Sequence, residues 1–179
     1  MAKRQDAPGR LELVREYVNS LDLERGTEAF ESASDLRDWL REAGLPTGQL
    51  VDADRVRAVE LREAIRSLAE ANNGTEISAH TVSVLDQAAR EAGVTLGFGA
   101  AGAPELRGTG TGLSAAFGEL LTVLALASLD GTWQRMRVCP NPECRWMFYD
   151  HSKNRSGRWC QMAECGNRAK VRAYRERTI

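Results

Sequence analysis

The sequence predicts a mainly α-helical protein with two parts, a helical body over residues 1–130 and a small C-terminal module over residues 131–179. Apolar residues recur at helical spacing through most of the body. All four cysteines lie in the module, and the charge divides at the same boundary. The body holds 13 Lys and Arg against 21 Asp and Glu, whereas the module holds 11 against 4. The module is therefore basic, as expected of a segment that contacts a polyanion.

Four segments of the body show the spacing of three and four that is typical of amphipathic helices. We expect helices over residues 11–23, 35–43, 52–72 and 79–92. Signals at their ends support the assignment. Ser78 is a suitable N-cap residue, Gly44 and Gly93 are suitable C-terminal residues, and Pro46 prevents continuation of the second helix.

The rest of the body predicts a short β-hairpin followed by a buried helix. Residues 94–98 and 105–112 flank a turn rich in Gly and Pro, which favours a hairpin. A Gly-x-Gly-x-x-Gly match falls in this turn, but Pro104 follows it where a dinucleotide site would need a helix. Residues 113–129 are apolar almost all round, so we expect the central buried helix here, ending at the domain boundary at Asp130-Gly131.

Composition also bears on the class of protein. No stretch of 18 or more apolar residues occurs, and the first ten residues lead into no apolar core of a signal peptide. We therefore expect a cytoplasmic protein without a membrane segment. The two histidines, His80 and His151, have no visible partner for general base catalysis, and we expect that the protein is not an enzyme.

The cysteines form two short-spaced pairs, Cys139-x4-Cys144 and Cys160-x4-Cys165, separated by fifteen residues. Two pairs at this separation suit a tetrahedral metal site, in which each pair wraps one side of the ion. A reducing compartment argues against disulfides, and the spacing differs from the Cys-x-x-Cys of redox sites. Zinc is the expected metal, with mononuclear iron as the minor alternative.

The residues around the cysteines predict a treble-clef-like zinc finger, made of a β-hairpin and a terminal helix. Residues 146–150 alternate as in a strand, residues 151–157 supply a turn, and Arg158-Trp159 leads back to Cys160. The stretch after Cys165 has good helix formers, so the fourth ligand is expected at the start of a helix. Its Val171 and Tyr174 are expected to pack on the hairpin aromatics. Since the module is small, the metal is expected to supply folding free energy.

These residues resemble the CGNR zinc finger over residues 135–177. The matching motifs, in order, are the paired cysteines, Trp146-x-Phe148-x-Asp150, Ser152-Lys153-Asn154, Arg158-Trp159-Cys160 and Cys165-Gly166-Asn167-Arg168. The family is expected to have two arginines before Trp-Cys, whereas this chain has Gly157-Arg158 before Trp159. The finger usually follows an ABATE domain, described as a putative stress-induced transcription regulator, and residues 11–44 are similar to its opening. The resemblance implies a transcription regulator whose finger binds DNA.

The module has a net charge of +7 from its Lys, Arg, Asp and Glu residues. Four thiolates with one divalent metal add −2, so the net charge falls to about +5 and the module is still basic. The side chains expected at a nucleic-acid interface are Lys153, Asn154, Arg155, Arg158, Arg168, Lys170, Arg172 and Arg175. Most would contact phosphates. Asn167 and Arg168 could equally be structural, because polar residues at a helix start often bind free backbone amides.

Two alternatives to DNA binding stay open, a zinc-braced module that docks a protein and an RNA-binding protein. The body would serve as the regulatory or partner-binding domain. A homodimer is also expected, because a single small finger offers few contacts and paired half-sites multiply affinity.

Overall fold

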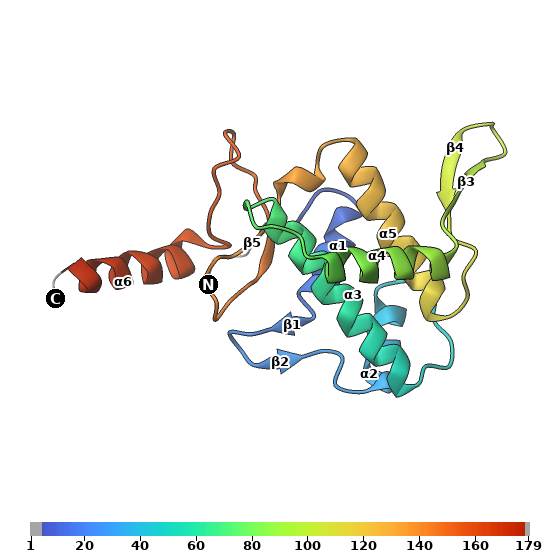
Figure 1. Ribbon diagram of the computed structural model, residues 1–179, viewed down its shortest axis with the longest axis horizontal. Helices are drawn as coiled ribbons and strands as arrows, with labels where there is room; N and C mark the ends of the chain where they lie inside the picture. The colour runs from blue at the N-terminus through green and yellow to red at the C-terminus, as the bar shows by residue number, and fades with distance from the viewer. Residues whose placement is uncertain (1–4, 178–179) are drawn as a thin grey trace.

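The computed structural model describes residues 5–177 and confirms the mainly α-helical class (Figure 1). The helices are α1 (Leu11–Val18), α2 (Ala33–Glu42), α3 (Asp52–Ala71), α4 (Ala79–Ala92), α5 (Leu113–Leu129) and α6 (Asn167–Arg177), with short helical turns η1 (Trp133–Arg135) and η2 (Met162–Gly166). The strands are β1 (Leu21–Asp22), β2 (Thr27–Glu28), β3 (Thr95–Phe98), β4 (Pro104–Arg107), β5 (Met136–Val138) and β6 (Met147–Tyr149), which pair in sequence order as three antiparallel hairpins.

Two local features mark the predicted helix ends: a side chain that caps the first turn, and a glycine that follows the last turn. The Ser78 hydroxyl accepts a hydrogen bond from the Thr81 amide at 3.1 Å at the start of α4. Gly44 and Gly93 follow α2 and α4 with φ of +69° and +57°, the left-handed conformation that glycine adopts without strain. The β3–β4 hairpin, with Thr95–Phe98 paired to Pro104–Arg107, confirms the hairpin predicted within residues 94–112.

The first predicted helix was too long. α1 ends at Val18, and Leu21 instead pairs with Glu28 in the β1–β2 hairpin. The Asp22 carboxylate accepts hydrogen bonds from the amides of Glu24 and Arg25, which forms the turn of that hairpin. Short polar side chains compete with helical backbone bonds in this way, so the helical spacing of Leu21 is overridden locally.

α5 covers the expected residues but is not buried on all sides. Its inner flank, which includes Leu120, belongs to the core, and Gly118 lets α5 approach α4 closely. A Cβ atom at Gly118 would lie 3.4 Å from the Gly108 Cα atom and 3.5 Å from the Ala92 Cβ atom. The outer flank near the end of α5 stays open, with Leu126 51% and Leu129 82% exposed. The prediction of a central buried helix was therefore wrong on this flank.

The hydrophobic core continues from the body into the C-terminal module. Met136, Val138 and Met147 of the β5–β6 hairpin are buried in one cluster with residues such as Val14 and Ile65 of α1 and α3. α6, in contrast, extends away from the rest of the molecule and has no buried residue (Figure 1). The module therefore has one half packed into the body and one half outside it.

The β-hairpin of the module has a different pairing from the predicted one. β6 pairs with β5, which precedes Cys139, and the register sets Val138 opposite Met147. Arg158-Trp159, predicted to lead back to Cys160 as the second strand, forms no strand. The turn of the hairpin is therefore the segment that contains the first cysteine pair, and residues 151–157 form a separate loop.

Within the part of the chain that the structure describes, no helix combines the length and the apolar character needed to cross a membrane.

Candidate metal centre

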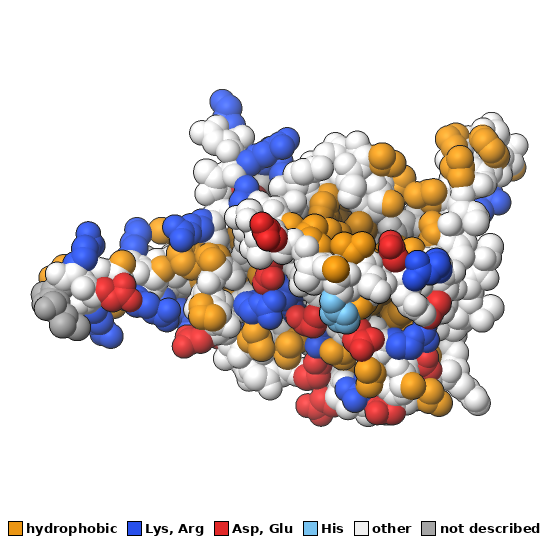
Figure 2. Space-filling view, in the orientation of Figure 1, with side chains coloured by type: hydrophobic (Ala, Val, Ile, Leu, Met, Phe, Trp, Pro, Cys, Tyr) orange, Lys and Arg blue, Asp and Glu red, His pale blue; other side chains and the backbone are white. Residues whose placement is uncertain are grey.

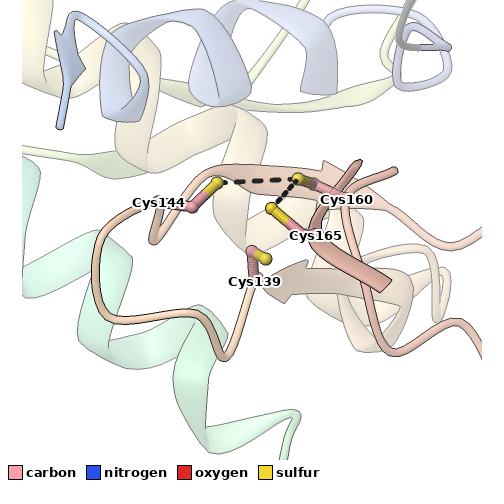
Figure 3. A group of neighbouring side chains, drawn as sticks. All are labelled: Cys139, Cys144, Cys160 and Cys165. Atoms are coloured by element: carbon pink, nitrogen blue, oxygen red, sulfur yellow. Dashed lines mark hydrogen bonds between the residues drawn. The ribbon is translucent and has the colours of Figure 1, made fainter. Parts of the chain in front are cut away.

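The four cysteines converge on one point between the two halves of the module (Figure 3). Their sulfur atoms all lie within 4.8 Å of one another. Cys139 and Cys144 come from the turn between β5 and β6, Cys160 precedes η2, and Cys165 lies in η2, just before α6. Cys139, Cys144 and Cys165 are buried, and Cys160 is half-buried. The predicted ligand set is thus assembled from segments on both sides of the intervening loop.

The sulfur spacing suits a tetrahedral metal ion. The Sγ atoms of Cys144 and Cys160 lie 3.6 Å apart, and those of Cys160 and Cys165 lie 3.8 Å apart. A metal–sulfur bond of about 2.3 Å gives an edge of about 3.8 Å in a regular tetrahedron. All four cysteines are free thiols, which leaves each sulfur available as a ligand.

Backbone hydrogen bonds shape the turn that carries the first pair. The Cys139 amide donates to the Trp146 carbonyl at 2.9 Å, which continues the β5–β6 ladder. The amides of Cys144 and Arg145 both donate to the Asn141 carbonyl, at 2.9 and 3.0 Å. Arg145 has φ of +45°, which reverses the chain after Cys144. This turn aims both sulfur atoms at the same point.

The electrostatics of the thiol cluster favour a bound cation. Hydrogen bonds from the thiols of Cys144 and Cys160 lower the pKa of Cys139. The hydrogen bond with Cys139 raises the pKa of Cys144, and hydrogen bonds with Cys139 and Cys144 raise the pKa of Cys160. Without a cation, one thiolate therefore opposes the ionisation of its neighbours. A divalent ion removes this opposition and takes four thiolates as ligands.

Two side chains from different parts of the module reach the fourth ligand. The Arg168 guanidinium group donates to Cys165 Sγ at 3.2 Å, and the Asn141 amide group donates to the same sulfur at 3.9 Å. Arg168 also forms an ion pair with Glu24 of the body at 2.7 Å. These contacts with Cys165 and Glu24 raise the pKa of Arg168. Asn167 donates to the Ala163 carbonyl at 3.0 Å and so braces η2.

The body holds the first half of the module through polar side chains as well as through the core. The buried Asn19 side chain pairs with both backbone groups of Met147, each at 2.8 Å. Arg66 of α3, 1% exposed, donates to the carbonyls of Val18 and Arg145 at 2.6 and 2.7 Å. Asn73 donates to the Val138 carbonyl at 2.7 Å. Body side chains therefore satisfy the backbone of β5, of the cysteine turn and of β6.

A buried carboxylate organises the loop over residues 151–157. Asp150 accepts hydrogen bonds from the amides of Ser152 and Gly157 at 2.9 and 2.8 Å. Burial would raise the pKa of Asp150, but these hydrogen bonds and the Arg137 charge lower it. Arg135 donates to the carbonyls of Asp150 and Ser152, both at 2.9 Å. A Cβ atom at Gly157 would lie 2.5 Å from a carboxylate oxygen of Asp150, which explains glycine at this position in the present loop.

The predicted nucleic-acid residues lie in two exposed segments. Lys153, Asn154, Arg155 and Arg158 lie in or next to the loop, and Arg168, Lys170, Arg172 and Arg175 lie on α6. Figure 2 shows Lys and Arg side chains on the projecting loop and along α6. The Arg158 guanidinium group lies 5.3 Å from the centre of the Trp159 ring. The Arg168 side chain instead contacts Cys165 and Glu24.

The expected packing of α6 on the hairpin aromatics was wrong. Val171 and Tyr174 remain 50% and 64% exposed, because α6 leads away from the β5–β6 hairpin instead of lying across it. The position of α6 relative to the finger therefore depends on η2, on the cysteine cluster and on Arg168.

Several residues that shape the site were missed from the sequence. They are Asn19, Arg66, Arg135, Arg137 and Asn141. For Arg137, a usable signal existed, because Met136-Arg137-Val138 alternates before Cys139 in the manner of a strand. For Asn19 and Arg66 no local signal existed, since their partners lie 128 and 79 residues away in the chain.

Comparison with known families agrees with this arrangement. Residues 11–130 match the ABATE family, described as "putative stress-induced transcription regulator", and residues 135–178 match the CGNR zinc finger. No curated protein matches the chain. The zinc-finger match and the four clustered thiols together identify zinc as the metal of this site.

Proposed function

Since the chain belongs to the ABATE family and carries a CGNR zinc finger, we propose that it is a transcription regulator whose finger binds DNA. The observation that supports this most strongly is the position of α6. This helix holds Arg168, Lys170, Arg172, Arg175 and Arg177 against Glu176 alone, and none of its residues is buried. A short helix without a packed face is marginally stable by itself, so a polyanionic partner would stabilise it.

The proposed interface combines α6 with the loop over residues 151–157. Lys153, Asn154 and Arg155 are exposed on the loop, and Lys170, Arg172 and Arg175 are exposed on α6. Asp150, Arg135 and Arg137 fix the loop from beneath, so its cations are held at the surface at low entropic cost. Most of these groups would contact phosphates and set the position of the finger on the duplex.

Asn167 and Arg168 have a different role in this proposal. Both make hydrogen bonds within the finger, and Arg168 is also paired with the body. A contact with a phosphate would have to compete with the Cys165 and Glu24 interactions of Arg168. We therefore assign these two residues to the structure of the finger rather than to its DNA contacts.

The zinc ion has a structural role in this proposal. Four cysteine ligands fill a tetrahedral shell and leave no position for a water molecule or a substrate. Cys139, Cys144, Cys160 and Cys165 would hold the ion, and its chemistry is to join the two halves of the module. On this basis we propose that the regulator is not an enzyme. We also propose that it acts in the cytoplasm.

The test is the salt dependence of DNA binding by the full-length zinc protein. We expect Arg172→Gln with Arg175→Gln to weaken binding and to reduce the slope of log affinity against log salt by about 2, since each lost phosphate contact removes about 0.9. The matched control is Arg37→Gln with Arg41→Gln on α2, two exposed arginines of the body. An unchanged slope in the α6 variant would exclude α6 from the interface.

The same assay separates the two alternatives. Stronger binding to RNA than to DNA of equal length would favour an RNA-binding protein. If the protein binds no nucleic acid at low salt, the result would favour the other alternative, a zinc-braced module that docks a protein.

We also propose that the protein is a homodimer. The β3–β4 hairpin sets Leu96 opposite Leu106 and Phe98 opposite Pro104, so one of its faces is wholly apolar. Figure 2 shows apolar side chains on this hairpin. At the other end of α5, Leu126 and Leu129 are also exposed. Exposed apolar surface of this kind favours an interface, and two fingers would read paired half-sites. Analytical ultracentrifugation of wild type and of the double variant Phe98→Ser with Leu129→Ser tests this. We expect a dimer for wild type and a monomer for the variant, and a monomeric wild type would contradict the proposal.

A further inference from the structure

The finger is joined to the body in two different ways. The β5–β6 half shares the hydrophobic core, whereas α6 has no buried side chain. Between α6 and the body, the Arg168–Glu24 ion pair forms a direct bridge, with Nη2 to Oε1 at 2.7 Å. Glu24 lies in the turn between β1 and β2, far from the cysteines in the sequence but next to η2 and α6 in space.

The same nitrogen of Arg168 serves two negatively charged partners. Arg168 Nη2 lies 3.2 Å from Cys165 Sγ as well as 2.7 Å from the Glu24 carboxylate. Cys165 is a thiolate when zinc is bound, and four thiolates with one Zn²⁺ leave a net charge of −2 on the centre. A guanidinium group placed against this centre offsets part of that charge through a charge-assisted hydrogen bond.

We propose that Arg168 is a positioning residue that couples the metal centre to the body. Its guanidinium group holds the Cys165 thiolate on one side and Glu24 on the other, so zinc binding and the docking of α6 onto the body stabilise each other. Such coupling is reciprocal, because two events that favour the same arrangement raise each other's equilibrium constants equally. The exposed Arg168–Glu24 pair would contribute little alone, and its effect depends on the thiolate that shares the arginine.

This role explains why an arginine follows Cys165 at a spacing of three. Residues at i and i+3 lie on the same side of a helix, so a side chain that starts on the first turn of α6 reaches back to the sulfur. Asn141, 3.9 Å from the same sulfur, lies on the other half of the module. Partners beyond the metal ligands fix the orientation of a ligand and tune its affinity, and losing one typically costs 10- to 100-fold in metal binding.

The test measures zinc affinity of the full-length protein without DNA, so its outcome is independent of the proposed function. We expect Arg168→Gln to weaken zinc binding by about 10- to 100-fold in competition with a chromophoric chelator. Arg168→Lys keeps the charge and should recover part of the loss. Arg172→Gln, the same change one turn further along α6, is the matched control and should bind zinc as wild type does.

Two further readouts distinguish coupling from a general loss of packing. In the cobalt-loaded protein, Arg168→Gln should move the thiolate-to-metal absorption to longer wavelength, because Cys165 loses a hydrogen bond and becomes a stronger donor. Glu24→Gln leaves the thiolate contact in place, so it should keep the cobalt spectrum while speeding amide exchange in α6. The proposal is overturned if Arg168→Gln matches Arg172→Gln in zinc affinity and cobalt spectrum, or if Glu24→Gln leaves α6 exchange unchanged.

Discussion

The two halves of the zinc finger are stabilised by different forces. Met136, Val138 and Met147 in the first half lie in the body's hydrophobic core, and Asn19 and Arg66 bind the backbone around them. The second half, residues 158–177, has α6 fully outside that core. Zinc joins the two halves because each contributes one cysteine pair. The boundary between folding driven by burial and folding driven by metal therefore runs through the finger and not between the finger and the body.

This difference revises the expectation that the metal folds the whole module. Burial of apolar side chains contributes about 25 cal/mol per Å² and does not depend on zinc. The β5–β6 hairpin has this contribution, so we expect it to remain folded when the metal is removed. α6 lacks it and depends on the metal, on η2 and on Arg168. The α6 side of the surface proposed for DNA is thus placed on the part whose order the metal controls, whereas the loop over residues 151–157 is held by Asp150 and Arg135.

Among substitutions of body residues that bind the first half of the finger, Arg66→Met is expected to have the largest effect. The change leaves the carbonyls of Val18 and Arg145 without their donor and should lower the free energy of unfolding by about 2 to 4 kcal/mol. Urea denaturation followed by circular dichroism measures it. The control Arg41→Met alters an exposed arginine of α2 and should stay within about 0.5 kcal/mol of wild type. Equal stability of the two variants would show that the finger is not anchored through Arg66.

Asn19→Ala should have the next largest effect. Its side chain is the partner of both the amide and the carbonyl of Met147, so its removal should cost about 2 to 3 kcal/mol in the free energy of unfolding. Asn154→Ala, in the exposed loop, is the matched control and should change stability by less than about 0.5 kcal/mol. The same urea denaturation measures both variants. An Asn19→Ala variant as stable as wild type would contradict anchoring of β6 by the residue that follows α1.

The smallest effect is expected for Asp150→Asn, which should cost about 1 to 2 kcal/mol because the amide keeps one acceptor oxygen. Hydrogen bonds lower the folded-state pKa of Asp150 below its unfolded value near 3.9. The carboxylate's contribution is therefore fully present above about pH 4 to 5 and is lost as the pH falls through the folded pKa.

Denaturation of the zinc-free proteins from pH 3 to 7 tests this without interference from metal release. The stability gap between wild type and Asp150→Asn should be constant at the upper end and should narrow toward pH 3. A gap of constant size over the whole range would show that the Asp150 charge does not stabilise the loop.

Local signals in the sequence were sufficient for helices α2 to α5 and for the metal ligands. Ser78, Gly44 and Gly93 mark helix ends through bonds to their own neighbours, and the paired spacing of the cysteines reflects the geometry of a tetrahedral ion. In each case the physical cause lies within a few residues of the signal.

The pairing of β5 with β6 and the burial of this hairpin in the body could not be predicted in this way. Alternation can indicate a strand in each segment, but three residues are too few to determine the pairing partner or the register, and the cysteine turn between them was assigned to the metal alone. The amide of Asn19 matches Met147 only because the fold brings α1 beside β6. Likewise, the helical spacing of Val171 and Tyr174 gave no information on whether another element lies against them.

Amide hydrogen exchange of the full-length protein with and without a zinc chelator tests the central claim most directly. We predict that chelation brings residues 158–177 to the exchange rates of an unfolded chain while Met136–Val138 and Met147–Tyr149 stay protected with the body. Loss of protection in both halves, or in neither, would contradict the division of the finger into a part folded by the core and a part folded by the metal.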